Sequence, residues 1–210
     1  MKERPIIFSA PMVRAILDGR KTQTRRIAKI PLDAKSAFYD DECDSHCWSM
    51  DDDGMADPHA KMLRNPYGEF RDRLWVREKW AYVPATAYRC SEGVWQTICA
   101  NDPDMAAVYA AGWERSRPSR WRPSIFMPRW ASRIELEITH VRVERLQDLT
   151  EEDARAEGCE REFKADGSNG WGAGLVEAVE NYRTLWNLIN GPGSWDLNPW
   201  VWVIQFKRVT

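Results

Sequence analysis

Alternating hydrophobic and polar positions predict strands at both ends of the chain and in two segments between them. The clearest pattern lies in residues 133–143, where Ile134, Leu136 and Ile138 fall on one face and most of the charged side chains on the other. Such alternation is typical of a strand that turns one face toward the core. The pattern predicts four strands, over residues 5–8, 73–80, 133–143 and 200–206.

Three further segments carry the spacing or the end signals of helices. The first begins after Ser9, an expected N-cap, and ends at Gly19. The second begins after Thr150 and ends near Glu157, and its first turn is acidic, which complements the helix dipole. The third is an amphipathic segment over residues 175–189. We therefore expect few helices beside a larger number of strands.

Two stretches, residues 31–66 and 84–120, lack a sustained period and are predicted to be irregular insertions. Within the second we expect a strand near residues 94–99 and a short helix near residues 103–111. Short strands with few helices predict an α+β fold, a small mixed β-barrel with flanking helices. The two insertions would then decorate one mouth of that barrel.

The length of 210 residues fits one domain with insertions. Hydrophobic residues make up 43% and charged residues 30%, which excludes a disordered chain, and no run approaches the ~18 apolar residues of a membrane span. The first residues lack the apolar core of a signal peptide, and the five cysteines lack a disulfide framework. We therefore predict a cytoplasmic protein with no membrane partner.

Charge is segregated along the chain although the net charge is only −2. Residues 20–29 and 115–133 carry basic side chains and no acid, whereas residues 40–57 carry eight acids and no Lys or Arg. Each run taken alone could be a solvated face of the protein. The presence of two basic runs also favours one shared site that binds an anion. Nucleic-acid binding would have to be local, because the bulk charge does not support it.

The basic turn after the first predicted helix places an amine, hydroxyls and guanidiniums close together. Such a set could cradle an anion or a carbonyl under attack. The alternative is that these cations complement the negative end of the helix dipole.

A second segment, residues 121–130, interleaves Arg with aromatic residues and prolines. Its rings either stack on bases or form a Trp–Arg plug over the core.

Three motifs in this order resemble those of ASCH domains, which are PUA-like β-barrels associated with RNA. They are AILDGRKTQTRR (15–26), DRLWV (72–76) and LTEEDARAEG (149–158). The segments RPSIFMPRW (122–130) and SWDLNPW (194–200) make the chain similar to long, prophage-encoded ASCH proteins. The chain departs from the family at Arg71, where a glycine commonly precedes the aspartate. The resemblance covers most of the chain apart from the two insertions.

Some ASCH proteins are amidohydrolases that act on N4-acetylcytidine, and others are linked to RNA cleavage. The resemblance implies catalytic roles for Lys21, Thr24 and Glu157 in this chain. The Thr24 hydroxyl would attack the acyl carbon, Lys21 would act as base with a pKa lowered by the arginines around it, and Glu157 would pass a proton to the leaving amine. The alternative is that Lys21 and Glu157 form an ion pair that only ties a helix to the barrel.

The predicted partner is a nucleoside or single-stranded nucleic acid. The predicted binding residues are Arg20, Arg25, Arg26, Trp75, Glu78, Arg122, Arg129 and Trp130. A non-catalytic nucleic-acid-binding module, a ribonuclease and a phage protein-interaction factor remain alternatives. Glu78 is either a second carboxylate of the site or a salt-bridge partner.

We predict no cofactor and no metal. The candidate metal ligands Cys43, His46, Cys47 and His59 lack the close pairs of typical zinc sites. The nearby aspartates could attract a hard cation, or form a solvated acidic loop.

Overall fold

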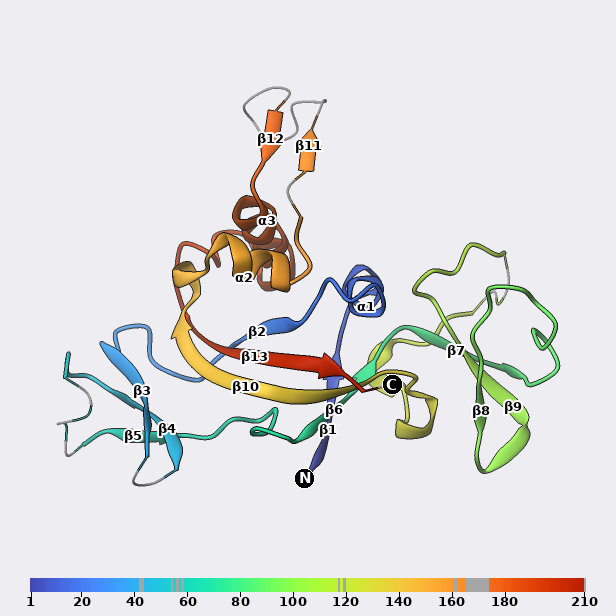
Figure 1. Ribbon diagram of the computed structural model, residues 1–210, viewed down its shortest axis with the longest axis horizontal. Helices are drawn as coiled ribbons and strands as arrows, with labels where there is room; N and C mark the ends of the chain where they lie inside the picture. Colours follow the sequence, from blue (N-terminus) through green and yellow to red (C-terminus); the bar gives the residue numbers. More distant parts are fainter. Residues whose placement is uncertain are drawn as a thin grey trace. The chain divides into compact units, whose positions relative to one another are not determined.

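The structure is a computed structural model. It describes residues 1–41, 44–53, 55, 57, 59–116, 118, 120–160, 162–164 and 174–209. The chain divides into two compact units. The first unit comprises Met1–Gly19, Tyr67–Ile138 and Phe206–Thr210, and the second comprises Arg20–Pro66 and Thr139–Gln205. The long strands β10 (Glu135–Arg145) and β13 (Trp200–Arg208) belong partly to each unit (Figure 1).

In the first unit, three strands that are distant in the sequence pair in one sheet. β1 (Glu3–Ile7) runs parallel to β6 (Arg73–Arg77), and the first residues of β10 pair antiparallel with β6. Helix α1 (Ala10–Leu17) follows β1 and buries Val13 and Ile16. The predicted N-cap and stop of this helix are confirmed by position, and Gly19 has a φ of 76°, which favours glycine.

The second predicted insertion supplies two strands of a three-stranded antiparallel sheet in the first unit, so the expectation that it is irregular is wrong; the third strand lies just before it. The strand order of this sheet is β7 (Trp80–Pro84), β9 (Asp102–Tyr109) and β8 (Thr97–Cys99). The helix predicted near residues 103–111 is therefore wrong. Ala106 and Ala107 are fully buried and pair with β7 on one edge and β8 on the other, so pairing on both edges overrides the helical preference of an alanine-containing segment. Two short 3-10 turns, η2 (Ser124–Phe126) and η3 (Arg129–Ala131), follow.

In the second unit, β2 (Gln23–Ile27) pairs antiparallel with β13. The residues of β13 are apolar on both faces, and Val201, Trp202, Val203 and Ile204 are buried, which is typical of a strand inside a sheet. This pairing fixes the register of β2, since Thr24 lies opposite Ile204. The predicted terminal strand is confirmed.

Two helices cover a tryptophan-rich core in the second unit. α2 (Glu151–Ala156) follows the 3-10 turn η4 (Leu146–Asp148). α3 (Ala178–Asn190) matches the predicted amphipathic segment from residue 178 onward, but the first residues of that segment, 175 and 176, lie in a strand. The buried cluster between these helices and the sheet contains Tyr182, Trp186 and Trp195. A short hairpin of β11 (Glu162–Lys164) and β12 (Gly174–Val176) joins α2 to α3 in the sequence.

The first predicted insertion also contains an antiparallel sheet, so the expectation that it is irregular is wrong. Its strands are β3 (Ser36–Asp40), β4 (Ser45–Ser49) and β5 (Lys61–Leu63). His46 of β4 is buried between the rings of Tyr39 and Trp202, with ring centroids 5.1 and 4.9 Å away. These strands are only three to five residues long, so their hydrophobic period is too short to be read from the sequence.

The coarse fold class is as predicted, a mixed α+β protein with mostly strands and few helices. Within the described residues, the helices are all too short or too polar to span a lipid bilayer.

The N-terminus of α2 is stabilised by a capping box between Thr150 and Asp153. The Thr150 hydroxyl accepts a hydrogen bond from the Asp153 N–H at 3.1 Å, and the Asp153 carboxylate accepts one from the Thr150 N–H at 3.3 Å. We expect Thr150→Ala to lower the free energy of unfolding by about 1 kcal/mol in urea denaturation, because an amide at the helix end loses its partner. Thr150→Ser should keep the stability, and equal losses in both variants would contradict the prediction.

Candidate functional site

The pair predicted from two distant motifs lies together in the second unit. The Lys21 ammonium donates to Oε2 of Glu157 at 2.7 Å and to the Glu157 carbonyl oxygen at 2.9 Å. Lys21 lies two residues before the start of β2, and Glu157 is the C-cap of α2. The Thr22 N–H donates to the Ala156 carbonyl at 2.8 Å, which holds the two segments against each other. The side chains of Lys21 and Glu157 are 0% and 3% exposed.

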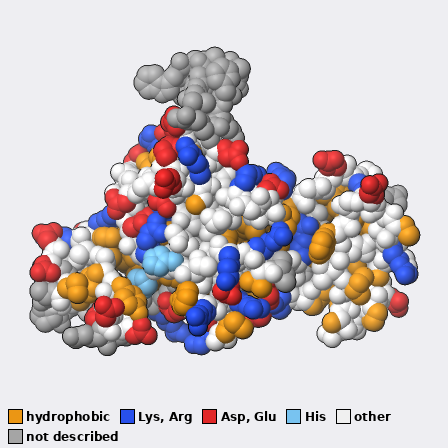
Figure 2. Space-filling model, in the orientation of Figure 1, with side chains coloured by type: hydrophobic (Ala, Val, Ile, Leu, Met, Phe, Trp, Pro, Cys, Tyr) orange, Lys and Arg blue, Asp and Glu red, His pale blue; other side chains and the backbone are white. Residues whose placement is uncertain are grey.

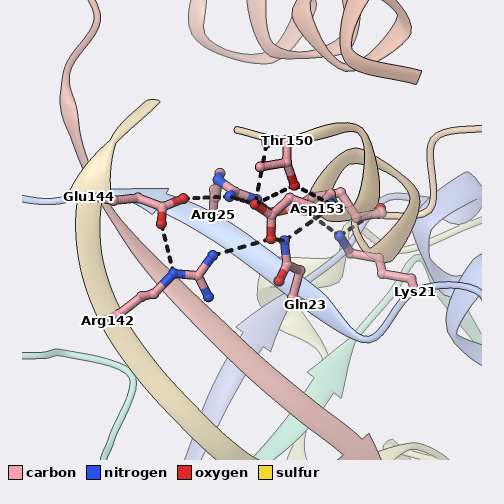
Figure 3. Close-up of polar contacts among 8 residues, drawn as sticks. Lys21, Gln23, Arg25, Arg142, Glu144, Thr150 and Asp153 are labelled. Atoms are coloured by element: carbon pink, nitrogen blue, oxygen red, sulfur yellow. Dashed lines mark hydrogen bonds and ion pairs between the residues drawn. The ribbon is translucent and has the colours of Figure 1, made fainter. Parts of the chain in front are cut away.

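The strand next to Lys21 extends this pair into a network, because alternate side chains of β2 face α2 (Figure 3). Gln23 donates from Nε2 to Oδ1 of Asp153 at 3.0 Å. The Arg25 guanidinium is fully buried and forms ion pairs with Glu144, Asp153 and Glu157. The distances from Arg25 to Asp153 and Glu157 are 3.2 and 3.4 Å.

Arg142 of β10 completes the network from the partly exposed side. Its guanidinium donates to Oε2 of Glu144 at 2.7 Å and to Oδ1 of Asp153 at 3.2 Å. Three cations thus face three carboxylates, and the network as described is balanced in charge. Removing the partner of a fully buried charge such as Lys21 or Arg25 leaves that charge unpaired, which costs roughly 3–5 kcal/mol. Loss of a partly exposed member such as Asp153 costs less, because other members and water still solvate its partners.

Burial changes the proton affinity of these groups. Burial lowers the pKa of Lys21 below its ordinary value, even though the charge and hydrogen bond of Glu157 act in the opposite direction. The positive charge of Arg26 lowers this pKa further. For Asp153, burial raises the pKa, but the Gln23 hydrogen bond and the Arg25 charge outweigh it and bring the pKa to about 2. Lys21 is thus an amine that releases its proton more readily than an exposed lysine.

Thr24, the third predicted catalytic residue, is buried at 1% exposure. It occupies the position of β2 between Gln23 and Arg25, so strand alternation directs its side chain to the opposite face. Among the described residues, its hydroxyl takes no part in the hydrogen bonds that join Lys21 to Glu157. The structure therefore brings two of the three groups into contact and leaves the third on the neighbouring face.

A pocket of about 600 Å³ lies in the second unit, and its lining includes the chain neighbours of Lys21 and Glu157 but neither residue of the pair. Its lining comes from the two segments that carry the pair and from one face of α3. These residues are Arg20, Gly158, Cys159, Glu160, Asn181, Thr184, Leu185 and Leu188. Arg20, a predicted binding residue, forms an ion pair with Glu160 at 3.3 Å at this pocket. The sequence analysis missed the α3 residues, although their i, i+3, i+4, i+7 spacing was a usable signal.

Two other predicted binding residues have structural roles in the first unit. Glu78 is 1% exposed and accepts from Nε and Nη2 of Arg133 at 2.9 and 3.0 Å. Burial raises the pKa of Glu78, against the opposing effect of Arg133. Trp75 is 8% exposed, and the Arg77 guanidinium lies 4.5 Å from its ring centroid. Of the two interpretations for Glu78, these contacts favour the salt-bridge partner.

The predicted Arg–aromatic segment forms a cluster in the first unit, which we call the indole–arginine cluster: Trp80, Tyr82, Arg122 and Trp130. The guanidinium of Arg122 lies 5.3 and 5.6 Å from the ring centroids of Trp80 and Tyr82. Trp130 contacts both rings edge-on, with centroid distances of 6.0 and 5.8 Å. Arg122 is exposed, whereas Arg129 is paired with Glu3 and Glu135. Charged side chains of both signs are interspersed on the visible face in Figure 2.

Of the candidate metal ligands, Cys43 lies outside the described residues. His46 is packed between aromatic rings, and burial lowers its pKa. His59 is exposed. In the part of the chain that the structure describes, His, Cys, Asp and Glu nowhere gather in a group of three or more that could hold a metal ion.

Comparison with family models, with curated proteins and with solved structures gave no match for this chain. The resemblance to ASCH domains therefore stays a prediction from the motifs.

The network predicts an acid-sensitive contribution to stability. Because the pKa of Asp153 is lowered from 3.8 to about 2 on folding, its carboxylate stabilises the fold above about pH 4, and this contribution is lost as the pH falls toward 2. We expect Asp153→Asn to cost about 1–2 kcal/mol at pH 7, after allowance for partial exposure, and progressively less below pH 4.

Urea denaturation between pH 2 and pH 7 measures this difference. Asp52→Asn is the control, since Asp52 is 87% exposed in a pair with Lys35 and should change stability by less than about 0.5 kcal/mol. A cost of Asp153→Asn that is the same at pH 3 and pH 7 would contradict the assignment.

Proposed function

We propose that the protein is an ASCH-like, PUA-type nucleoside-binding protein that hydrolyses N4-acylated cytidine at Lys21 and Glu157. The observation that carries this proposal is the buried contact between the Lys21 amine and the Glu157 carboxylate. These two residues stand 136 positions apart and come from the two motifs that suggested the activity. The PUA-like barrel implied by the resemblance and the cytoplasmic location predicted from the cysteine usage belong to the same proposal.

The proposed reaction uses Lys21 as base. Burial lowers its pKa, so a larger fraction of the amine is neutral at a given pH than for an exposed lysine. Neutral Lys21 accepts the proton of the Thr24 hydroxyl as that oxygen attacks the acyl carbon, and Glu157 relays a proton to N4 as the C–N bond breaks. Water then hydrolyses the acyl ester, so that the products are cytidine and a carboxylic acid.

This mechanism requires a local movement. Lys21, Thr24 and Glu157 are each at most 4% exposed, and Thr24 lies on the neighbouring face of β2. The proposed reactive state therefore differs from the described one by an opening that admits the acyl group and turns the Thr24 hydroxyl toward the amine. A structural ion pair would need no such opening, and this difference separates the two interpretations.

A second candidate function is binding of single-stranded nucleic acid by the indole–arginine cluster. Its support is the exposed Arg122 guanidinium over two aromatic rings, an arrangement that can stack on a base and contact phosphate. Arg129 contributes less to this proposal because Glu3 and Glu135 already neutralise it.

The hydrolase proposal predicts that Lys21→Met abolishes release of acetate from N4-acetylcytidine. We expect kcat to fall by about 10²–10⁴, the usual contribution of a general base. Met fills a similar volume, and near-ultraviolet circular dichroism checks the fold. Lys29→Ala is the matched control, because Lys29 lies in the same basic run and is exposed. Turnover of the wild type that equals turnover of the folded Lys21→Met variant would remove the proposal.

The pH profile gives a second readout of the same role. Because burial lowers the pKa of Lys21, the rate should rise with pH and level off below the ordinary lysine value of 10.5. Thr24→Ser should retain turnover and Thr24→Val should lose it. Equal rates for these two variants would exclude Thr24 as the nucleophile.

The binding proposal predicts that Arg122→Ala weakens binding of a ten-nucleotide oligouridylate by about three- to tenfold in low salt. The binding constant of this variant should also depend less steeply on salt concentration than that of the wild type. Arg115→Ala serves as control, because Arg115 is exposed in the same unit and donates to the Glu92 carbonyl. Thr24→Ala should have little effect. Binding that none of these changes alters would count against the cluster.

A further inference from the structure

The pocket beside Lys21 and Glu157 is built from the chain neighbours of both residues. Arg20 immediately precedes Lys21, and Gly158 and Cys159 immediately follow Glu157. The φ of Gly158 is 88°, a conformation that favours glycine and turns the chain sharply after the C-cap. The pocket is therefore lined by the residues adjacent to the pair in both segments, while Lys21 and Glu157 themselves are buried behind this lining.

The opposite wall is one face of α3. Ala178, Tyr182 and Trp186 occupy the buried face of this helix, with 0%, 4% and 5% exposure. The residues that line the pocket belong to a different stripe of the same helix. They are Asn181, Thr184, Leu185 and Leu188. One face of α3 thus packs into the core, and another face lines the pocket.

The lining changes in character along this helix. Asn181, near the start of α3, donates to the Glu160 carbonyl at 2.8 Å, beside the ion pair of Arg20 with Glu160. Leu185 and Leu188, one and two turns further on, are apolar, and Leu188 is 81% exposed. A wall with a polar end and an apolar end fits a ligand that carries a polar group and an extended apolar group.

We propose that this pocket holds the acyl group of the substrate and selects long, apolar acyl chains over acetyl. The proposal rests on the proposed function for the identity of the substrate. The volume of the pocket, about 600 Å³, lies within the ~300–1,000 Å³ of pockets that hold whole small molecules. An acetyl group needs far less room. An acyl carbon at the pair would direct its chain past Gly158 and Cys159, along Leu185 and Leu188.

Binding of non-hydrolysable analogues tests this selectivity without requiring turnover. We expect N4-hexylcytidine to bind more tightly than N4-methylcytidine, by about two- to fourfold for each methylene that is covered. Isothermal titration calorimetry of both ligands measures the ratio. Leu188→Asn should remove most of the preference for the hexyl analogue. Ile189→Asn is the matched control, because Ile189 is 53% exposed on the same turn and does not line the pocket.

Hydrolysis of N4-acetyl- and N4-hexanoylcytidine by the same variants separates the two proposals. A hexyl preference that Leu188→Asn abolishes, without turnover of either amide, would support the pocket and refute the hydrolase. Turnover with no dependence on chain length would support the hydrolase and overturn the pocket proposal. Failure of both analogues to bind, or an equal preference in Leu188→Asn and the wild type, would also overturn it.

Discussion

The second unit depends on one constraint, the burial of positive charge on β2. Lys21 and Arg25 have fully covered side chains, and such charges are tolerated only when carboxylates neutralise them and their N–H groups find acceptors. α2 supplies Asp153 and Glu157 for this purpose. The position of α2 against β2 is therefore fixed by charge and hydrogen bonds as well as by apolar packing.

The tryptophan content of the chain is explained mainly by packing. Trp80, Trp186, Trp195, Trp200 and Trp202 are all buried, and their rings contact other aromatic rings or arginine guanidiniums. The guanidinium of Arg145, for example, lies 4.3 Å from the Trp200 ring centroid. In these positions the large rings fill the core, and arginine covers them at its edge. The guanidinium of Arg122, over the rings of Trp80 and Tyr82, is exposed, and this exposure is the basis of the proposed nucleic-acid contact.

α3 links stability to the candidate pocket. Its buried face packs Tyr182 and Trp186 into the core, so the helix cannot rotate without loss of that packing. This restraint keeps Leu185 and Leu188 at the pocket wall. A rigid helix with one face in the core is a suitable support for a binding site.

The elements with local signals could be predicted from the amino-acid pattern: the strand at β10, the capped ends of α1 and α2, and the apolar β13. The sequence also named Lys21 and Glu157 as partners through the motifs. Strand alternation already places Thr24 on the face opposite Gln23 and Arg25, and helical spacing already places Asn181, Thr184, Leu185 and Leu188 on one face of α3. Only the three-dimensional structure shows that residues 102–109 form a strand and that this face of α3 lines a pocket, because both features depend on contacts between segments that are distant in the sequence.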